Sequence, residues 1–435
     1  MSDTRPNILF LFSDQHRADA LSCAGDPNVE TPHLAALAGQ GIRLANAYSN
    51  TPLCSPFRAT LYTGRYITTH GVTSLFVPLL PRQPTLPQIL REAGYHTSHM
   101  GKWHLAGGDC PSHFVSPYFR PGWDDWLGWD NSNEPFATEY GVGDQPAPLL
   151  VFDRFQTDAL ADLTIEWLRV KDRRKPWFHV MSFEPPHPDR FCRYVAPEPY
   201  MAMYRHRPLS LPNSFERSGT EDFEGQLRGY YAMIRNMDDN IGRVLRALEE
   251  TGQRDNTIVV YFSDHGDLLG NHGLRQKSRP EEESARIPFI VRWPRGIPAS
   301  RLSPALFSGV DILPTVLGLA GVPCPESVEG RDASPVLRGE REAVNEDVLL
   351  QFESNFFSHR RDESLCFRAL RHGPWKYTVF LERGPSQLFN LDDDPNERRN
   401  LIADPGASAV RTLLDTRLRA RCAEIGDSFF ERVRR

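Results

Sequence analysis

Short, nearly continuous runs of apolar residues recur along the first 320 residues of the chain and predict the strands of a buried sheet. Three of them span residues 7–12, 178–183 and 257–262, and each ends at Pro, Ser or Asp residues. Runs of this length without alternation are typical of strands covered on both faces, as in a parallel sheet between helices. Because ligands bind beyond the carboxyl ends of such strands, we expect the polar residues that follow the three runs to meet at one site.

A segment between the second and third of these runs has the apolar period of a helix. Between residues 227 and 251 an apolar residue returns every three or four positions, which predicts an amphipathic helix, and Gly252 is suited to end it. Strands and helices alternate up to about residue 320, so we predict a doubly wound α/β catalytic domain over residues 1–345. Residues 106–145, rich in Gly, Pro, Trp and Asp, show neither period, and we interpret them as a long loop insertion near the site.

The pattern changes after about residue 345. Short strands are predicted at 347–352, 366–370 and 375–381, and a helix is predicted at 405–425. This order indicates a small C-terminal subdomain, residues 346–435, with an antiparallel sheet and one helix.

Composition narrows the possible partners. The chain has 435 residues, of which 40% are hydrophobic and 24% charged, with a formal net charge of -6, whereas a nucleic-acid-binding chain would normally be basic. No segment has the ~20 apolar residues of a membrane span, and residues 1–5 lack the apolar core of a signal peptide, so we expect a cytoplasmic protein without a membrane partner. The cysteines have no C-x-x-C spacing, which argues against a disulfide framework or a zinc site. They are Cys23, Cys54, Cys110, Cys192, Cys324, Cys366 and Cys422.

The most informative motif is CSPFR at residues 54–58, with TGR following at 63–65. Cys54 is expected at the start of a helix from Pro56 to Thr63, where backbone N–H groups favour an anion. Four further motifs are GKWHL at 101–105, PPHP at 185–188, GNHGL at 270–274 with Lys277 after it, and LFNL at 388–391.

Together these motifs resemble those of the type I sulfatase family: its C-x-P-x-R signature with T-G-R, its G-K-W-H-L, P-H-x-P and G-x-H-G-L…K segments, and its closing motif. The resemblance runs from Pro6 to Leu401 and implies an alkaline-phosphatase-like α/β sandwich. In that family a maturation enzyme oxidises the cysteine to formylglycine (3-oxoalanine), so it implies this change at Cys54 and transient contact with such an enzyme. One hydroxyl of the hydrated aldehyde would attack sulfur and displace the alcohol, and the second would then expel sulfate.

The resemblance also implies one divalent cation at the strand ends. Carboxylate, amide and imidazole groups there make a plausible cation site, with Ca²⁺ as the first expectation and Mn²⁺ or Zn²⁺ as alternatives that suit imidazole better. The implied ligands are Asp14, Gln15, Cys54, Asp264 and His265. Taken without the family, Asp14 and Asp264 could instead cap the helices that follow them.

Further residues receive roles from the resemblance. Arg58 would hold the formylglycine and offset charge around the metal, and His104 would orient the formylglycine or act as its base. Lys102 and Lys277 would bind ester oxygens, while His187 would contact the substrate and act as general acid for the leaving alcohol. The plainer alternative makes both lysines solvated cations and both histidines ordinary loop residues.

Two questions stay open in the sequence. Trp123, Trp126 and Trp129 either line a substrate entrance, where aromatic faces would stack on sugars or attract a quaternary ammonium group, or pack the insertion onto the domain. The predicted function is hydrolysis of a small-molecule or carbohydrate sulfate ester. A phosphonate monoester or phosphodiester hydrolase would use the same residues, and a non-catalytic anion-binding protein with unmodified Cys54 is the third possibility. The sequence predicts neither the alcohol nor the oligomeric state.

Overall fold

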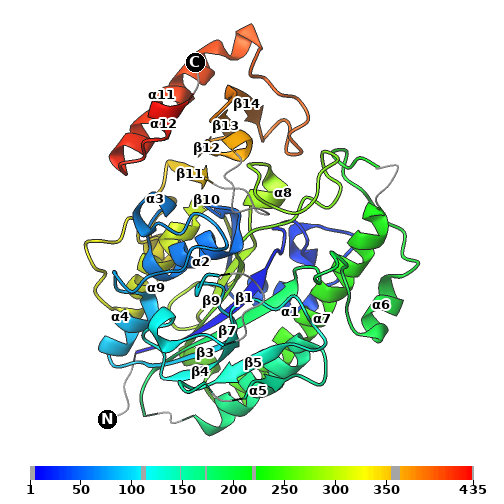
Figure 1. Ribbon diagram of the computed structural model, residues 1–435, viewed down its shortest axis with the longest axis vertical. Helices are drawn as coiled ribbons and strands as arrows, with labels where there is room; N and C mark the ends of the chain where they lie inside the picture. The colour runs from blue at the N-terminus through cyan, green and yellow to red at the C-terminus, as the bar shows by residue number, and fades with distance from the viewer. Residues whose placement is uncertain are drawn as a thin grey trace.

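The computed structural model describes residues 5–108, 114–146, 148–171, 174–217, 222–353 and 363–433. In this part of the chain a ten-stranded, mostly parallel sheet lies between helices, and a four-stranded sheet lies beyond it (Figure 1). In spatial order the strands of the large sheet are β10 (Arg301–Ser308), β2 (Ile42–Tyr48), β9 (Phe289–Arg292), β8 (Thr257–Ser263), β1 (Asn7–Asp14), β7 (Trp177–Pro186), β3 (His96–Lys102), β4 (Asp125–Trp129), β5 (Glu139–Val142) and β6 (Leu150–Val151).

The three predicted apolar runs are the adjacent central strands β8, β1 and β7. Ile8 of β1 lies in parallel register with Ile258 on one side and Phe178 on the other. The side chains of β1 are buried on both faces of the sheet. The prediction of buried parallel strands is therefore confirmed, and their carboxyl ends lie at one edge.

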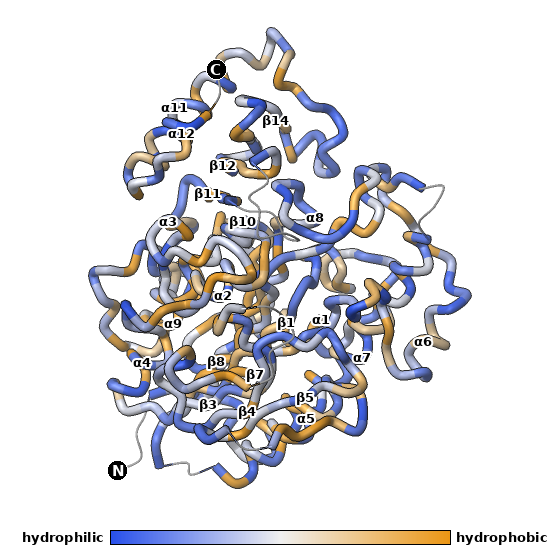
Figure 2. The backbone as a smooth tube through the Cα atoms, in the orientation of Figure 1, coloured by the Kyte–Doolittle hydropathy of each residue, from blue (hydrophilic) through white to orange (hydrophobic). Residues whose placement is uncertain are grey.

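Alternate residues of β1 face two separate helix layers. Ile8, Phe10 and Phe12 belong to one apolar cluster, and Leu9 and Leu11 to another. The first layer contains α2 (Cys54–Thr63), α4 (Leu86–Glu92) and α9 (Ile312–Ala320), and the second α1 (Pro32–Gly39), α5 (Gln156–Val170) and α7 (Phe223–Glu250). Figure 2 shows hydrophobic segments at the centre around β8 and many hydrophilic ones at the periphery.

The long helix α7 confirms the predicted amphipathic segment and begins four residues before it. The Asp222 side chain accepts the N–H of Gly225 at 2.8 Å and caps the first turn. Gly252, with φ of 70°, lies in the left-handed region just beyond the last turn, where a residue without a Cβ is favoured.

The insertion at 106–145 is not the structureless loop that we expected. Its β4 pairs in parallel with β3, and β5 pairs antiparallel with β4, so the insertion extends the sheet. The sequence hides β4 because its five residues, DWLGW, have neither a continuous apolar run nor a strict apolar–polar alternation, although most of them are buried. Residues 109–113, including Cys110, lie outside the described part.

The C-terminal subdomain has an antiparallel sheet and a helix, as predicted. Its strands are β11 (Asp347–Phe352), β12 (Phe367–His372), β13 (Trp375–Phe380) and β14 (Gly384–Asn390), and its helix is α11 (Ser408–Glu424). The sequence did not predict β14, which contains a proline and polar residues without clear alternation. The proposed boundary near residue 345 stays a prediction.

One buried cation joins this subdomain to the catalytic domain. Nζ of Lys376, in β13, lies 3.0 Å from a carboxylate oxygen of Glu282 and 2.6 Å from one of Glu397. Glu282 begins α8 (Glu282–Ala285). The other short helices are α3 (Ile67–His70), α6 (Glu198–Tyr204), α10 (Ser334–Arg338) and α12 (Phe429–Arg432). Among the described helices, none has the length and apolar character needed to cross a membrane.

Candidate active site

The carboxyl ends of β1, β3 and β8 meet the first turn of α2. Asp14 is the last residue of β1, Lys102 the last of β3 and Cys54 the first of α2, while Asp264 and His265 follow β8. All five are buried, and Cys54 is 1% exposed. The structure thus brings these distant segments together, as the pattern of strand ends predicts.

Four potential ligand atoms, from Asp14, Cys54, Asp264 and His265, lie within 4.8 Å of one another. Sγ of Cys54 lies 3.2 Å from Nε2 of His265 and 3.6 Å from Oδ1 of Asp14. Nδ1 of His265 lies 2.9 Å from the carbonyl oxygen of Gly266. Because a carbonyl only accepts, Nδ1 carries the proton and Nε2 offers its lone pair to the cluster.

The electrostatics of this cluster suit a cation. Burial, followed by the charge of Asp14, raises the pKa of Asp264 to about 7. Burial, followed by Lys277, lowers the pKa of His265 to about 3, so the imidazole is neutral at physiological pH. Oδ2 of Asp264 has no hydrogen-bond partner among the described residues, although Arg58 Nη2 lies 3.5 Å away. Two carboxylates and a neutral imidazole form a donor set that fits one divalent cation.

Neither aspartate caps a helix. Oδ1 of Asp264 accepts the N–H of Gln15 at 3.0 Å and that of His265 at 2.9 Å. In the described chain no α-helix begins directly after Asp14 or Asp264. The helix-capping alternative is therefore wrong.

Two buried cations, Arg58 and Lys102, neutralise Asp14. Nζ of Lys102 lies 2.9 Å from Asp14 Oδ2 and 3.4 Å from Glu184 Oε1, and Arg58 Nη2 lies 3.3 Å from Asp14 Oδ2. Arg58 Nη1 donates to the carbonyl of Lys102 (2.8 Å) and to Ser182 Oγ (3.0 Å), which fixes the guanidinium. Burial alone would lower the pKa of Lys102, but Asp14 and Glu184 raise it above its usual value. Lys102 is not a surface cation.

Both predicted catalytic histidines have pKa values well below the usual range, so both are neutral imidazoles. Burial, followed by Lys102 and Arg58, lowers the pKa of His104 well below its usual value, and neither ring nitrogen has a hydrogen-bond partner in the described structure. Burial, followed by Lys277 and Lys102, does the same to the pKa of His187. Nδ1 of His187 lies 2.8 Å from the carbonyl oxygen of Pro188.

Gln15 and Lys277 form a buried pair at the same edge. Lys277 Nζ donates to the amide oxygen of Gln15, so this lysine is not solvated as the plainer alternative required. Gln15 has φ of 70°, and its Nε2 donates to Asp267. The role of Gln15 as a cation ligand stays a prediction.

The tryptophans pack the insertion onto the domain. Trp123, Trp126 and Trp129 are buried, and the Trp126 ring stacks on His99 with centroids 4.8 Å apart. Trp123 stacks on Phe178 of β7 at 5.5 Å. The packing interpretation is confirmed, and the interpretation that they line a substrate entrance is wrong.

Three residues of the site were missed. Glu184 contacts Lys102, Asp267 contacts Gln15, and Tyr194 donates to Asp267. The only signal for Glu184 is a charged residue at the end of an otherwise apolar strand, just before the PPHP motif. Asp267 follows the Asp-His pair by two residues, where it resembles an ordinary loop carboxylate.

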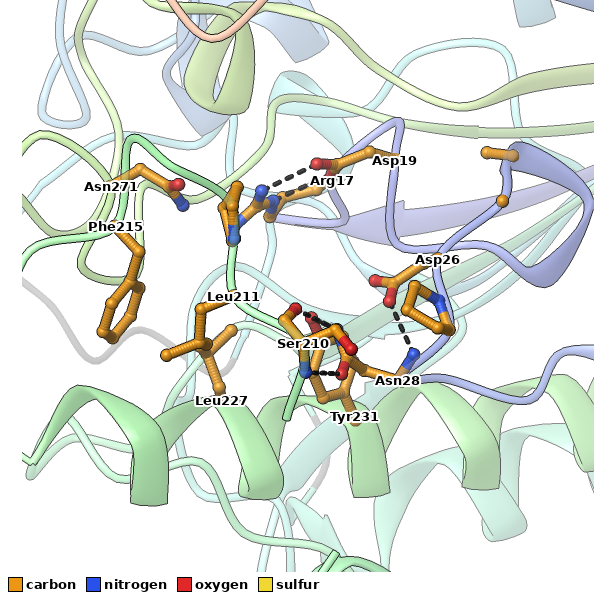
Figure 3. Close-up of a pocket in the computed structure, with 14 residues that line it drawn as sticks. Arg17, Asp19, Asp26, Asn28, Ser210, Leu211, Phe215, Leu227, Tyr231 and Asn271 are labelled. Atoms are coloured by element: carbon orange, nitrogen blue, oxygen red, sulfur yellow. Dashed lines mark hydrogen bonds and ion pairs between the residues drawn. The ribbon is translucent and has the colours of Figure 1, made fainter. Parts of the chain in front are cut away.

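A separate pocket of about 300 Å³ lies beside α7 (Figure 3). Arg17 lines this pocket, and its guanidinium donates two hydrogen bonds to the carboxylate of Asp19, at 2.9 and 2.7 Å. Asp26 accepts the N–H of Asn28, whose side chain bonds to the backbone of Ser210. Among the described residues that line this pocket, none is a predicted catalytic or metal-binding residue.

Comparison with known proteins identifies two family models along the chain. One, described as Sulfatase, matches residues 6–322. The other, described as N-sulphoglucosamine sulphohydrolase, C-terminal, matches residues 270–424. The first model alone covers well over half of the chain.

Individual proteins match over nearly the whole length. The chain is 34% identical to an ulvan-active sulfatase of Formosa agariphila, over 99% of this chain and 83% of that protein. The structure of yidJ from Bacteroides fragilis matches with a TM-score of 0.90 and 28% identity, covering 100% of this chain and 99% of that one. The phosphonate monoester hydrolase of Agrobacterium radiobacter matches with a TM-score of 0.76 and 26% identity, covering 97% and 96%.

Proposed function

The chain belongs to the sulfatase family and hydrolyses sulfate esters, and we propose that it does so with a formylglycine made from Cys54 and one divalent cation. The observation that carries this proposal is the position of Cys54. It begins α2 within the CSPFR motif, with Sγ 3.2 Å from His265 Nε2 and 3.6 Å from Asp14 Oδ1. The alternative of a non-catalytic anion-binding protein is wrong.

Residues already in place would hold both the formylglycine and the divalent cation. Formylglycine would supply a hydroxyl nucleophile at position 54, and the cation would offset negative charge on the ester oxygens. Asp14, Asp264 and Nε2 of His265 would hold the cation, with Gln15 as a further ligand. Ca²⁺ is the first metal to test, followed by Mn²⁺ and Zn²⁺, which suit imidazole better.

The buried cations of the chain would bind and orient the ester anion. Lys102 and Lys277 each carry an ammonium group that can donate to sulfuryl oxygens, and Arg58 stabilises negative charge next to position 54. The first backbone N–H groups of α2 add a favourable potential for an anion. Fixed donors of this kind stabilise charge that develops in the transition state without further reorganisation.

His187 would protonate the leaving alcohol. Its Nδ1 donates to the Pro188 carbonyl, so Nε2 is the nitrogen that would deliver a proton. Burial, followed by the charges of Lys277 and Lys102, holds the pKa of His187 below its usual value, and an anionic ester beside the two lysines would oppose their effect. His104, with both ring nitrogens unpartnered in the described structure, would orient the nucleophile or act as its base.

We propose a carbohydrate sulfate ester as the substrate, with small-molecule sulfate esters as the second class. The name of the ulvan-active relative supports this choice. We further propose transient contact with a formylglycine-forming enzyme, a cytoplasmic location and no membrane or nucleic-acid partner. The net charge of -6 supports the last of these.

A phosphonate monoester or phosphodiester hydrolase is the second candidate. The match to a phosphonate monoester hydrolase, at 26% identity over nearly the whole chain, favours keeping it. Such an enzyme would use the same buried cations and strand-end ligands, so the two functions differ in the ester they prefer.

A paired rate measurement tests the proposal. Protein with bound cation, and with formylglycine occupancy determined by mass spectrometry, is given an aryl sulfate and the matched aryl phosphonate monoester. A higher kcat/KM on the sulfate, lost in Cys54→Ala, is the expected result. A clear preference for the phosphonate would move the chain to the second candidate, and full activity of Cys54→Ala would exclude the formylglycine mechanism.

A further inference from the structure

The side-chain amide of Gln15 is bound at both ends inside the protein. Its Nε2 donates to Oδ2 of Asp267 and lies 3.5 Å from the hydroxyl oxygen of Tyr194. Its Oε1 accepts from Nζ of Lys277. All four side chains are buried, so water does not replace these bonds easily.

The chemistry of the two partners permits only one orientation of this amide. An ionised carboxylate only accepts hydrogen bonds and an ammonium only donates them. The NH₂ end of Gln15 must therefore face Asp267, and the oxygen must face Lys277. A half-turn of the amide would place oxygen against oxygen and NH₂ against ammonium, and both contacts would be repulsive.

The second oxygen of Asp267 holds the turn that carries Lys277. Oδ1 accepts the N–H of Leu269 at 3.1 Å and the N–H of Gln276 at 2.9 Å. Gln276 directly precedes Lys277 and has φ of 66°, a left-handed conformation that a side chain of this size adopts only when held. One carboxylate thus fixes both members of the Gln15–Lys277 pair.

We propose that Asp267 is a positioning residue of the sulfatase site. It selects the orientation in which Gln15 presents its amide oxygen, and it sets the turn that brings Lys277 to that oxygen. This inference rests on the proposed function, because it takes Gln15 as a cation ligand and Lys277 as a contact to the ester. Outer partners of metal ligands typically change metal affinity about 10- to 100-fold when they are replaced.

Asp267→Asn tests the proposal because it reverses one contact and preserves the shape. The new amide oxygen keeps the two backbone N–H groups, so its NH₂ faces Gln15 and turns the Gln15 oxygen away from Lys277. Affinities for Ca²⁺ and for Mn²⁺ are measured separately by calorimetry on metal-free protein. The expected loss is about 10- to 100-fold for the cation that binds wild type.

A matched control is Asp311→Asn. Asp311 is also buried and accepts two backbone N–H groups, from Arg331 and Ser308, and one amide NH₂, from Asn345. Its replacement should leave cation affinity within about twofold of wild type. Tyr194→Phe removes a donor to Asp267 without reversing the amide, and it should also stay within about twofold. A loss of about 10-fold or more in Tyr194→Phe would overturn the assignment to Asp267, and this outcome can be read even if Asp267→Asn does not fold.

A double-mutant cycle separates positioning from simple loss of charge. In a Gln15→Ala background, Asp267→Asn should cause no further loss of cation affinity. A full additional loss there, or unchanged affinity in the single variant, would overturn the proposal. Asp264→Ala should lose the cation entirely. This variant therefore distinguishes a wrong role for Asp267 from a wrong location of the cation site. If Asp264→Ala still binds, the cation site of the proposed function is wrong as well.

Discussion

Sγ of Cys54 lies 3.2 Å from Nε2 of His265, yet the imidazole does not activate the thiol. Burial, followed by the negative charge of Asp14, raises the pKa of Cys54 to about 12. The imidazole is neutral, so it does not stabilise a thiolate as a protonated histidine would. An unconverted chain therefore holds a protonated thiol where the proposed mechanism needs a nucleophile.

The first prediction concerns the reactivity of this thiol. In folded, unconverted protein, iodoacetamide should modify the exposed Cys192 and leave Cys54 unmodified, because the reagent attacks thiolates and Cys54 is buried. Peptide mass spectrometry measures both sites. Unfolded protein serves as the control, in which both should react. Equal modification of Cys54 and Cys192 in the folded protein would contradict the prediction.

The second prediction concerns Lys102. Lys102→Ala should lower kcat/KM on an aryl sulfate about 100-fold or more, because it removes a preorganised donor for the ester oxygens. The same change leaves Asp14 and Glu184 without their shared cation, so the unfolding midpoint should fall as well. Lys175→Ala, at an exposed position, is the control and should change neither quantity. A kcat/KM within a few-fold of wild type would show that Lys102 does not contact the ester.

The third prediction separates His187 from the other site residues. His187→Ala should lower the rate on a sulfate ester of a poor leaving alcohol about 100-fold, and far less on an activated aryl sulfate, because only the former needs a proton. The measurement is kcat/KM across a series of leaving groups. Equal losses along the series would remove His187 as the general acid.

The fourth prediction tests the packing role of the tryptophans. Trp126 is 5% exposed, stacks on His99 and carries the Arg120 guanidinium 4.4 Å above its ring centroid. Trp126→Ala should lower the free energy of unfolding by about 3–5 kcal/mol and leave KM unchanged within about twofold. Denaturant unfolding measures the free energy of unfolding, and steady-state kinetics measure KM. A large rise in KM with little loss of stability would return Trp126 to the substrate entrance.

The fifth prediction is a pH dependence at the junction of the two domains. Glu397 shares Lys376 with Glu282, and burial raises the pKa of Glu397 from its usual 4.5 to about 8. The folded state then retains a proton that the unfolded state loses. The stability contributed by Glu397 is therefore fully present at pH values below the pKa of Glu397 in the unfolded chain. It is lost as the pH rises through the pKa of Glu397 in the folded protein.

Comparison with Glu397→Gln isolates this contribution. Unfolding free energies of both proteins are measured from about pH 5 to about pH 9. The stability of wild type relative to the variant should fall with pH across this window. A difference that stays constant with pH would mean that Glu397 is ionised throughout and simply paired with Lys376.

The fold could be predicted where both faces of a strand are covered. β1, β7 and β8 are buried on both faces and are apolar at most positions, and such runs are visible in a sequence. β4 was missed because its own tryptophans, Trp126 and Trp129, lie in a Gly-, Trp- and Asp-rich segment that resembles a loop. β14 was missed because an edge strand with Pro385 and polar residues has no period.

Some residues of the site could be predicted from the sequence and others could not, again for a physical reason. The residues of the motifs, such as Cys54 and Lys102, were predictable because their spacing resembles a known family. Asp267 and Glu184 were not, because a carboxylate in a loop or at a strand end usually faces water. Only the packing of distant segments shows that Glu184 is buried beside Lys102 and that Asp267 is buried beside Gln15.

The burial of α2 bears on when the proposed oxidation of Cys54 could take place. All ten residues from Cys54 to Thr63 are buried, so an oxidising enzyme could not bind this segment in the folded chain. Under the proposed conversion of Cys54, oxidation would therefore have to precede the burial of α2. A chain that folded first would keep its thiol and would lack the proposed nucleophile.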